Sequence, residues 1–312
     1  MWRTSHVIAA LAGLSLISPQ APRSAGPAYT EWSAPVNLGA PLNTAQWDEA
    51  FPAVSKDGLS LYMTSNRPGG SGGYDIWVSQ RDSENEPWGT PMNLGPVVNS
   101  AAFDASPALS RDGHWLFFHT NRPGGRGGFD LMASWRRYTR DDFGWETPIF
   151  LAEDNSTLDD AFPAYFEEEE SGVAELYFSS IRTGGVGLVD IYVSRFGSDG
   201  ALGAPELVPE LCSASLDFGA EISHNGREMF FLSNRPGSTG LSDLWVSTRP
   251  SVDDPWTTPV NLEVLNTAYG EAGPAISSDN MTLIFNSNWE TGGKSADLYV
   301  TTRSHITGRR ER

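Results

Sequence analysis

Cysteine is nearly absent from this chain of 312 residues, which contains Cys212 and no other. A single cysteine excludes an internal disulfide, so the fold must be stabilised by packing alone. No histidine accompanies Cys212 in the sequence pattern, and we expect a buried small residue there rather than a nucleophile. Long apolar runs are also missing from the body of the chain, where none approaches the roughly 18 residues that mark a membrane span.

Positive charge is scarce: 21 basic residues face 39 acidic ones, for a formal net charge of −18. The first 25 residues have Arg3, an apolar core over 7–17 and small residues at 24–25, a pattern typical of a secretory signal peptide. Its removal would take away Arg3, Arg23 and no acid, which moves the net charge to −20. Such a charge repels nucleic acid and anionic membranes. We expect a periplasmic or secreted protein with neither partner.

Glycine, proline and tryptophan, by contrast, are abundant, and this composition favours many short strands joined by tight turns. The chain is also repetitive. An Asp followed by Ile or Leu recurs at spacings of 55, 60, 53 and 54 residues, at Asp75, Asp130, Asp190, Asp243 and Asp297. Five copies at one period predict a repeat architecture.

Each repeat contains four stretches of strand length, rich in aromatic and β-branched residues. The first opens with Trp-x-x-Pro, at 32–38, 88–94, 145–151, a degenerate 202–208, and 256–262. The second holds a proline in most repeats, at 50–55, 105–110, 161–166, 219–223 and 272–277. The third follows a short turn, at 59–65, 115–120, 175–180, 228–233 and 282–287, and a Gly-rich loop leads to the fourth, at 75–81 and its equivalents.

The turn between the second and third stretches carries Asp-Gly or Asn-Gly in three repeats, for example Asp57-Gly58. These pairs predict two-residue hairpin turns, whose central residues both need positive φ. The third repeat replaces the turn with a longer segment containing four consecutive glutamates, 167–170, which we interpret as a solvated bulge.

The pattern S-x-D-G-x-x-L-[YF]-F-x-S-N-R…D-[IL]-W, clearest over 55–81 and again from Ser110, resembles the PD40-type WD40-like repeat of TolB-like propellers. The resemblance implies an all-β fold, a five-bladed β-propeller of four-stranded antiparallel blades with the Pro-containing strand innermost. Segment 32–38 would then complete the last blade and close the ring, which removes free strand edges. We expect a signal peptide at 1–25, a linker at 26–31, the propeller at 32–303 and a disordered basic tail at 304–312.

Candidate site residues gather at one end of the innermost strands. Each strand opens with an acid three positions before its proline or the equivalent residue, and these candidate catalytic residues are Glu49, Asp104, Asp160, Asp217 and Glu271. The Gly-rich loops bring four arginines to the same face, Arg67, Arg122, Arg182 and Arg235, whereas the fifth repeat has Trp289. Aromatic platforms for a ligand would be Trp47, Phe103 and Tyr269.

Two interpretations of this ring stay open. The acids and arginines could pair with one another to hold adjacent blades together, as repetition in all five blades favours. They could instead surround an axial pocket that binds a protein or a carbohydrate. We expect an exported, monomeric, non-catalytic binding or scaffolding module that uses this acid–arginine face.

The alternative is a glycoside hydrolase or polysaccharide lyase. Five-bladed glycosidases place axial carboxylates at the mouth of the channel, and the pairs Asp48-Glu49 and Asp159-Asp160 are its first candidates.

Other chemistries find little support in the sequence. A phosphate-binding role for loop 68–73 fails because this loop joins two strands and leads into no helix. The histidines have no ligand-like spacing, and we expect no cofactor; calcium is the one ion the acids could hold, and the four arginines oppose it. No local signature of a Ser–His–Asp triad is present. The Asp that heads each fourth strand is expected to cap the Gly-rich loop.

Overall fold

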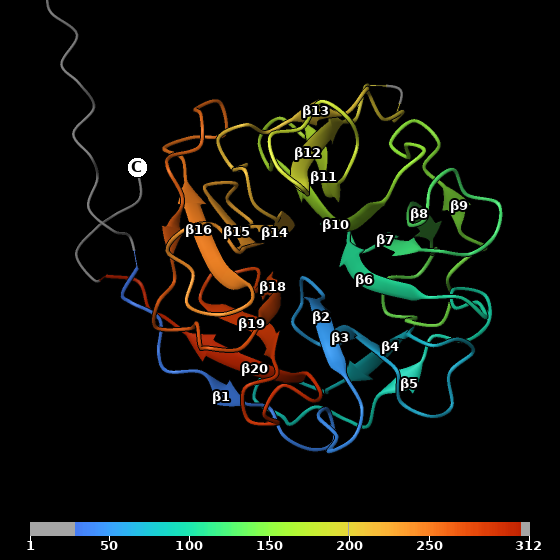
Figure 1. The fold of residues 1–312 in the computed structure, drawn as a ribbon. Coiled ribbons are helices and arrows are strands. Elements are labelled where there is room, and N and C mark those ends of the chain that lie inside the picture. Colours follow the sequence, from blue (N-terminus) through green and yellow to red (C-terminus); the bar gives the residue numbers. More distant parts are fainter. Residues whose placement is uncertain (1–28, 199, 307–312) are drawn as a thin grey trace, which may run out of the picture.

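The computed structural model describes residues 29–198 and 200–306. Within these residues, twenty strands form five four-stranded antiparallel sheets, and Figure 1 shows them arranged as blades around a central axis. The prediction of an all-β five-bladed propeller is therefore confirmed. The expected signal peptide at 1–25 and residues 307–312 of the expected tail lie outside the described residues.

Each blade runs outward from the axis, and blades 1 to 5 follow the order of the chain. The innermost strands are β2 (Glu49–Val54), β6 (Asp104–Leu109), β10 (Asp160–Glu167), β14 (Asp217–Ile222) and β18 (Glu271–Ile276). The second strands are β3 (Ser60–Ser65), β7 (Trp115–Thr120), β11 (Ala174–Ser180), β15 (Glu228–Ser233) and β19 (Thr282–Ser287). The third strands are β4 (Asp75–Gln80), β8 (Asp130–Trp135), β12 (Asp190–Arg195), β16 (Asp243–Thr248) and β20 (Asp297–Thr302).

The outermost strands are only two residues long: β5 (Met92–Asn93), β9 (Ile149–Phe150), β13 (Glu206–Leu207), β17 (Val260–Asn261) and β1 (Val36–Asn37). The Trp-x-x-Pro segments predicted longer strands. A proline precedes each pair and has no N–H to donate to the sheet, which limits the pairing. The expected closure is confirmed, because β1 pairs antiparallel with β20 in blade 5, with Val36 opposite Val300.

The turns that join each innermost strand to the second strand of its blade differ from the expected two-residue type. In blade 1 the N–H of Gly58 donates to the carbonyl of Ser55, and Gly58 has a φ of 69°, whereas Asp57 is not left-handed. The side chain of Asp57 accepts hydrogen bonds from the hydroxyl of Ser55 and the N–H of Leu59. A capped turn followed by one left-handed residue therefore replaces the turn with two residues of positive φ.

Every innermost strand is interrupted one residue before its proline or the equivalent residue. There the pairing register shifts and the backbone is left-handed, at Phe51, Ser106, Phe162, Gly219 and Gly273, with φ between 47° and 62°. This conformation costs a residue other than glycine about 1–2 kcal/mol. The sequence pattern did not predict these bulges, which turn backbone and side chains toward the axis.

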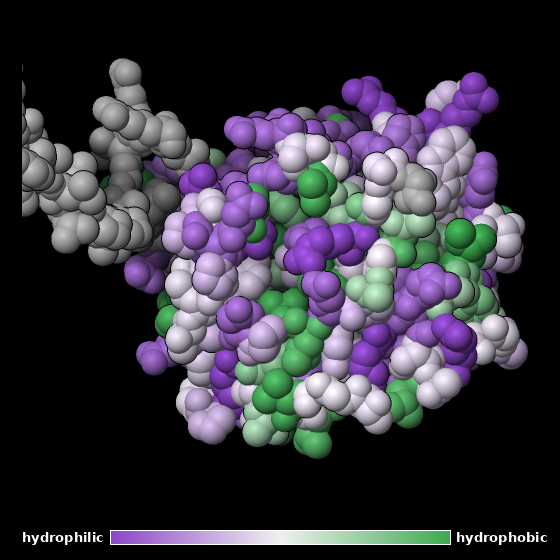
Figure 2. All heavy atoms as spheres, turned by 90° about the horizontal axis from the view of Figure 1, so that it is seen from above, coloured by the Kyte–Doolittle hydropathy of each residue, from purple (hydrophilic) through white to green (hydrophobic). Residues whose placement is uncertain are grey.

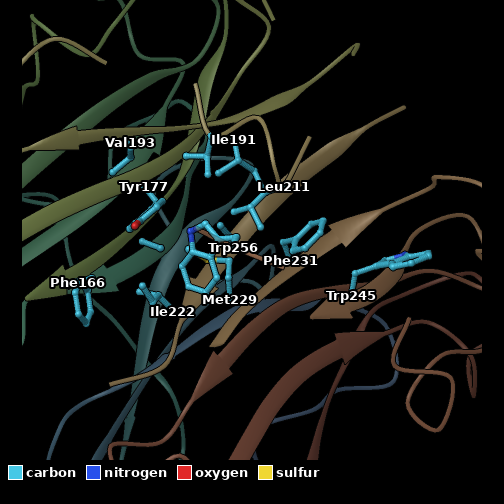
Figure 3. Packing of buried hydrophobic residues seen from close by; sticks show 13 residues of the cluster. Phe166, Tyr177, Ile191, Val193, Leu211, Ile222, Met229, Phe231, Trp245 and Trp256 are labelled. Carbon is cyan, nitrogen blue, oxygen red and sulfur yellow. The ribbon is translucent and has the colours of Figure 1, made fainter. Parts of the chain in front are cut away.

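Hydrophobic clusters fill the spaces between neighbouring blades. Figure 3 shows the cluster between blades 3 and 4, where Trp256 lies among Met229, Leu211 and Tyr177. On the side of the molecule seen in Figure 2, hydrophilic residues cover most of the surface and hydrophobic residues form small groups between them. No helix in the described part of the chain is long and apolar enough to cross a bilayer.

Candidate functional site

The five acids that open the innermost strands lie together around the axis, as the repeat spacing predicts, but all of them are fully buried. Four form ion pairs with the arginine of their own blade: Glu49–Arg67 at 2.9 Å, Asp104–Arg122 at 2.6 Å, Asp160–Arg182 at 2.6 Å and Asp217–Arg235 at 2.5 Å. These pairs join residues of one blade. The interpretation that they bridge adjacent blades therefore needs a further contact.

The arginines supply that contact through the segment that enters each blade. The same Nη2 atom of Arg67 that meets Glu49 also donates to the carbonyl of Leu42 at 2.6 Å. Arg122, Arg182 and Arg235 donate in the same way to the carbonyls of Val98, Asp154 and Leu211. Each pair therefore fastens the connector from the preceding blade, which is a structural task.

Blade 5 lacks the arginine, and its acid is satisfied by hydroxyl groups and a peptide N–H. Glu271 accepts hydrogen bonds from the hydroxyls of Thr267 and Ser287 and from the N–H of Thr267. Burial raises the pKa of Glu271 above its usual value. Trp289 packs on Tyr299, with ring centroids 4.9 Å apart. Glu271 is thus free of arginine but closed to solvent.

Two half-buried carboxylates flank the buried ring on the face where the innermost strands begin, here called the loop face. Asp48 accepts hydrogen bonds from the hydroxyl of Tyr74, from the side chain of Asn66 and from the N–H of Ala296. Burial and the hydrogen bond to Asp48 raise the pKa of Tyr74 to about 12, so Tyr74 remains a donor. Three donors hold the carboxylate of Asp48 in one orientation.

Asp159 occupies the equivalent position in blade 3, directly before Asp160. Its Oδ1 atom accepts a hydrogen bond from the N–H of Phe129 at 3.0 Å. Among the described residues, none donates a hydrogen bond to its Oδ2 atom. Asp159 also lines a hollow, so this oxygen is available to a ligand.

That hollow, here called the mouth hollow, has a volume of about 330 Å³ and largely aromatic walls. They include Phe51, Phe103, Phe129, Phe162 and His119. Burial lowers the pKa of His119 to about 3, so its ring is neutral and its Nδ1 accepts a hydrogen bond from the N–H of Phe162. An apolar pocket beside one carboxylate is the arrangement typical of a small-molecule site.

Of the aromatic residues expected to contact a ligand, the mouth hollow includes Phe103 alone. Phe103 packs at a tilt against Tyr74, the partner of Asp48, with ring centroids 4.7 Å apart. Trp47 is half-buried at the start of blade 1, and Tyr269 is 40% exposed; neither lines this hollow.

The floor of the mouth hollow is formed by two phenylalanines that meet across the axis. Phe51 of blade 1 and Phe162 of blade 3 have ring centroids 5.1 Å apart, although their blades are not neighbours in the ring. Both are left-handed residues of the bulges described above. Their rings narrow the channel at this point and separate its two ends.

The other end of the channel contains a carboxylate that the sequence analysis missed. Glu221 lies on β14 at the position occupied by alanine in the other blades, Ala53, Ala108, Ala164 and Ala275. It lines a cavity of about 60 Å³ together with Lys56, Arg111 and His224. Burial raises the pKa of Glu221 to about 8, so it is largely protonated at neutral pH. Comparing the five innermost strands position by position would have revealed it.

The Asp at the head of the fourth repeat stretch caps the Gly-rich loop in four blades, as predicted. In blade 1, Asp75 accepts hydrogen bonds from the N–H groups of Ser71 and Gly72. Asp130, Asp190 and Asp243 accept the equivalent bonds. In blade 5, Asp297 instead accepts a bond from the side chain of Asn37.

Metal and thiol chemistry have little basis in the described residues. No group of three or more His, Cys, Asp or Glu side chains among them is placed to hold a metal ion. Cys212 is half-buried, its thiol donates to the carbonyl of Val208, and burial raises its pKa to about 12. A thiol with such a pKa is a poor nucleophile at neutral pH.

Comparisons with known proteins support the fold. No family model and no curated protein matches the sequence. A thermostable family-43 glycoside hydrolase superposes with a TM-score of 0.59 at 13% identity, covering 88% of this chain and 97% of that one. An α-L-arabinofuranosidase from Podospora anserina, in complex with cellotriose, gives 0.56 at 12% identity, covering 89% and 98%. TolB from Acinetobacter baumannii gives 0.47 at 14% identity, covering 82% and 54%.

The likenesses with TM-scores of 0.55 to 0.59 support a shared fold, and they correct one expectation. The non-catalytic binding module is contradicted, because the solved propellers with TM-scores of 0.55 to 0.59 are glycoside hydrolases and arabinofuranosidases. The expectation rested on five near-equal repeats with no differentiated carboxylate. Asp48, Asp159 and Glu221 are such carboxylates: the position shared by Asp48 and Asp159 has no acid in the other three blades, and Glu221 replaces an alanine.

Proposed function

We propose that this protein is a glycoside hydrolase that acts at the mouth hollow. The observation that carries the proposal is the placement of Asp159, a half-buried carboxylate with an unbonded oxygen, in an aromatic-walled hollow on the propeller axis. Sugar rings present apolar C–H faces that pack on aromatic walls, while a carboxyl group beside them can exchange a proton with the glycosidic oxygen.

The two carboxylates of the loop face have different surroundings, which suggests different roles. Asp159 has an oxygen without a hydrogen-bond partner among the described residues and lines the mouth hollow, so we assign it as the general acid that protonates the leaving glycosidic oxygen. Asp48 lies outside the walls of the hollow, and its partner Tyr74 packs against Phe103 of those walls. Three donors orient Asp48, so we assign it as the carboxylate that takes a proton from the attacking water or stabilises the cationic transition state. In this assignment the buried acid–arginine pairs hold both residues in place.

The substrate class follows from the hollow and from the structural neighbours. A volume of about 330 Å³ lies at the lower end of the range for small-molecule pockets, so it suits one or two sugar rings. Several structural neighbours are arabinofuranosidases, and one GH62 hydrolase is in complex with xylotriose. We therefore propose arabinose- or xylose-containing glycans as substrates, with the terminal sugar in the mouth hollow.

The test is the release of sugars from arabinoxylan, arabinan and xylo-oligosaccharides by the purified protein and three variants. Asp159→Asn and Asp48→Asn should each lower kcat by about 10²–10⁴. Asp253→Asn is the matched control, because Asp253 is exposed and remote from the mouth hollow, and it should behave like the wild type. A folded wild-type protein inactive on the whole panel would overturn the proposal, as would an Asp159→Asn variant with full activity.

We also propose that the chain is exported and that its blades are PD40-type repeats of the TolB-like kind. The apolar core over 7–17 and the repeated motif from Ser55 support these two statements. Mass spectrometry of the N-terminus of the protein recovered from a periplasmic or secreted fraction tests the first. A chain that still begins at Met1, in the cytoplasm, would contradict it.

A further inference from the structure

Four blades share an aromatic staple at the point where they meet the preceding blade. A tryptophan at the start of the outermost segment stacks on an arginine that follows the third strand: Arg81 over Trp88 at 4.1 Å, Arg136 over Trp145 at 4.3 Å, Arg249 over Trp256 at 4.3 Å and Arg303 over Trp32 at 4.4 Å. The same tryptophan packs against an apolar connector residue, as Trp256 does against Leu211 in Figure 3.

Blade 3 has replaced all the partners of this staple. Leu202 stands where the tryptophan would be, and Phe196 stands where the arginine would be. The connector residue is Asp154, whereas the other blades have buried apolar residues there, Leu42, Val98, Leu211 and Leu265. An indole and a guanidinium are thus missing from one interblade contact of the ring.

The space they leave is open. A hollow of about 450 Å³ lies between blades 2 and 3 and is lined by Asp154, Leu202 and Phe196, together with Phe117 and Tyr165. The rings of Phe117 and Tyr165 are stacked 5.5 Å apart and nearly parallel. We call it the blade 3 hollow; it is distinct from the mouth hollow on the axis.

Asp154 is the buried carboxyl group of this hollow, which the exposed Glu153 also lines. The side chain of Asp154 is 1% exposed; Oδ1 accepts the hydroxyl of Ser194, and Oδ2 has no hydrogen-bond partner among the described residues. The equivalent serines of blades 1, 2 and 4 donate to a backbone carbonyl instead, as Ser79 does to Gly89. A buried carboxyl oxygen without a partner is costly, so a native structure should have a reason for it.

We propose that the blade 3 hollow binds a small aromatic amine of about the size of an indole. Its ring would occupy the space that tryptophan fills in the other blades, against Phe117, Tyr165 and Phe196. Its ammonium or ring N–H would donate to the carboxyl group of Asp154, which lines the hollow. Oδ2 is buried in the empty protein, so the side chain has to turn toward the ligand to accept this hydrogen bond. Stacking supplies the apolar part of the affinity, and the buried carboxylate selects a donor and rejects an anion. The site does not depend on the hydrolase activity proposed above.

The charge of Asp154 depends on the groups around it. Burial raises its pKa to about 6, Arg182 opposes this rise, and Asp160 and Glu153 add to it. Above that pH the carboxylate is charged and favours an ammonium ligand; at pH 4.5 it is protonated. Binding of an ammonium should therefore weaken between pH 7.5 and pH 4.5.

Calorimetry with tryptamine, indole and indole-3-acetate tests the proposal. At pH 7.5 we expect tryptamine to bind the wild type best, indole more weakly and the anionic acetate not at all. Asp154→Leu, which introduces the residue type of the other blades, should weaken tryptamine binding at least tenfold and leave indole binding nearly unchanged. Leu202→Trp should fill the hollow and abolish binding of both while the protein stays folded.

Asp253→Asn provides the control for a change in charge far from the hollow, and it should bind tryptamine as the wild type does. Absence of tryptamine binding up to millimolar concentration would overturn the proposal. Equal tryptamine binding by the wild type and Asp154→Leu would overturn it too, even if Leu202→Trp fails to fold.

Discussion

At the scale of single residues, Glu221 shows how one substitution in a repeat creates a new electrostatic environment. The neighbouring blades present a methyl group to the channel at this position, and blade 4 presents a carboxyl group. Its Oε1 atom accepts a hydrogen bond from the N–H of Ile276 in blade 5, at 3.3 Å. One weak acceptor contact does little to offset the removal of the charge from water, so the protonated form is favoured.

The pH dependence of stability should reveal this group. The pKa of Glu221 is raised from 4.5 to about 8 in the folded protein, so the folded state holds the proton more tightly than the unfolded state. Its stabilising contribution is complete below pH 4.5 and is lost as the pH rises to about 8. Glu221→Gln should flatten this part of the Tm profile. The exposed Glu263→Gln is the control, and equal slopes in all three proteins would contradict the assigned pKa.

The buried acid–arginine pairs make a second prediction at this scale. Arg235→Met leaves the fully buried carboxylate of Asp217 without its cation, which should cost about 3–5 kcal/mol in the free energy of unfolding. Arg195→Met breaks contacts of a side chain that is 53% exposed and should cost less than about 1 kcal/mol. Urea denaturation measures both. If Arg235→Met also lowered the free energy of unfolding by less than about 1 kcal/mol, the ring pairs would not be structural.

Single residues that differ from the repeat were also the hardest functional candidates to predict from the sequence. The repeat pattern located the ring acids and arginines because each occurs at least four times. Segment 202–208 was recognised as degenerate, but Glu221 and Asp154 each occur once at their position, so a consensus of the five repeats does not show them. Asp48 and Asp159 were noticed only as neighbours of the ring acids. Their availability depends on the direction of a bulged strand, which no local pattern indicates.

At the scale of elements, β1 is a two-residue strand, like the other outermost strands, and it closes the ring. Two paired residues and the hydrogen bond from Leu38 N–H to the carbonyl of Leu298 join the start of the described chain to blade 5. Without them, β20 becomes an exposed strand edge, which invites pairing between molecules.

A protein beginning at Gly39 should therefore melt at a lower temperature and associate in solution. A protein beginning at Tyr29 retains β1 and should remain monodisperse. Size-exclusion chromatography with light scattering and a thermal melt distinguish the two. Identical behaviour would mean that blade 5 is stable with three strands.

The elements themselves were largely predictable from the sequence. Repeat spacing, proline positions and strand-forming residues located four strands per blade and the closure by the first segment. The bulges were not predictable, because Phe51 and Phe162 are unexpected in a left-handed conformation and only the crowded axis imposes it. The length of the outermost strands was overestimated because the proline before each of them has no N–H to donate and so limits the pairing.

At the scale of the whole molecule, the propeller is a regular frame with a few irregular positions. Buried ion pairs and interblade staples recur around the ring and stabilise it, while the mouth hollow and the blade 3 hollow occur where the repetition fails. We therefore propose that function resides at these departures from symmetry, and above all that Asp159 donates the proton to the leaving oxygen of a glycan.

The most direct test compares two substrates with different leaving groups. A 4-nitrophenyl glycoside expels a phenolate that needs little protonation, whereas an oligosaccharide needs a general acid. If Asp159 is that acid, Asp159→Asn should lower kcat on the arabinosylated oligosaccharide by at least about 10² and affect the 4-nitrophenyl arabinofuranoside far less. Equal losses on both substrates, or no loss on either, would contradict the account.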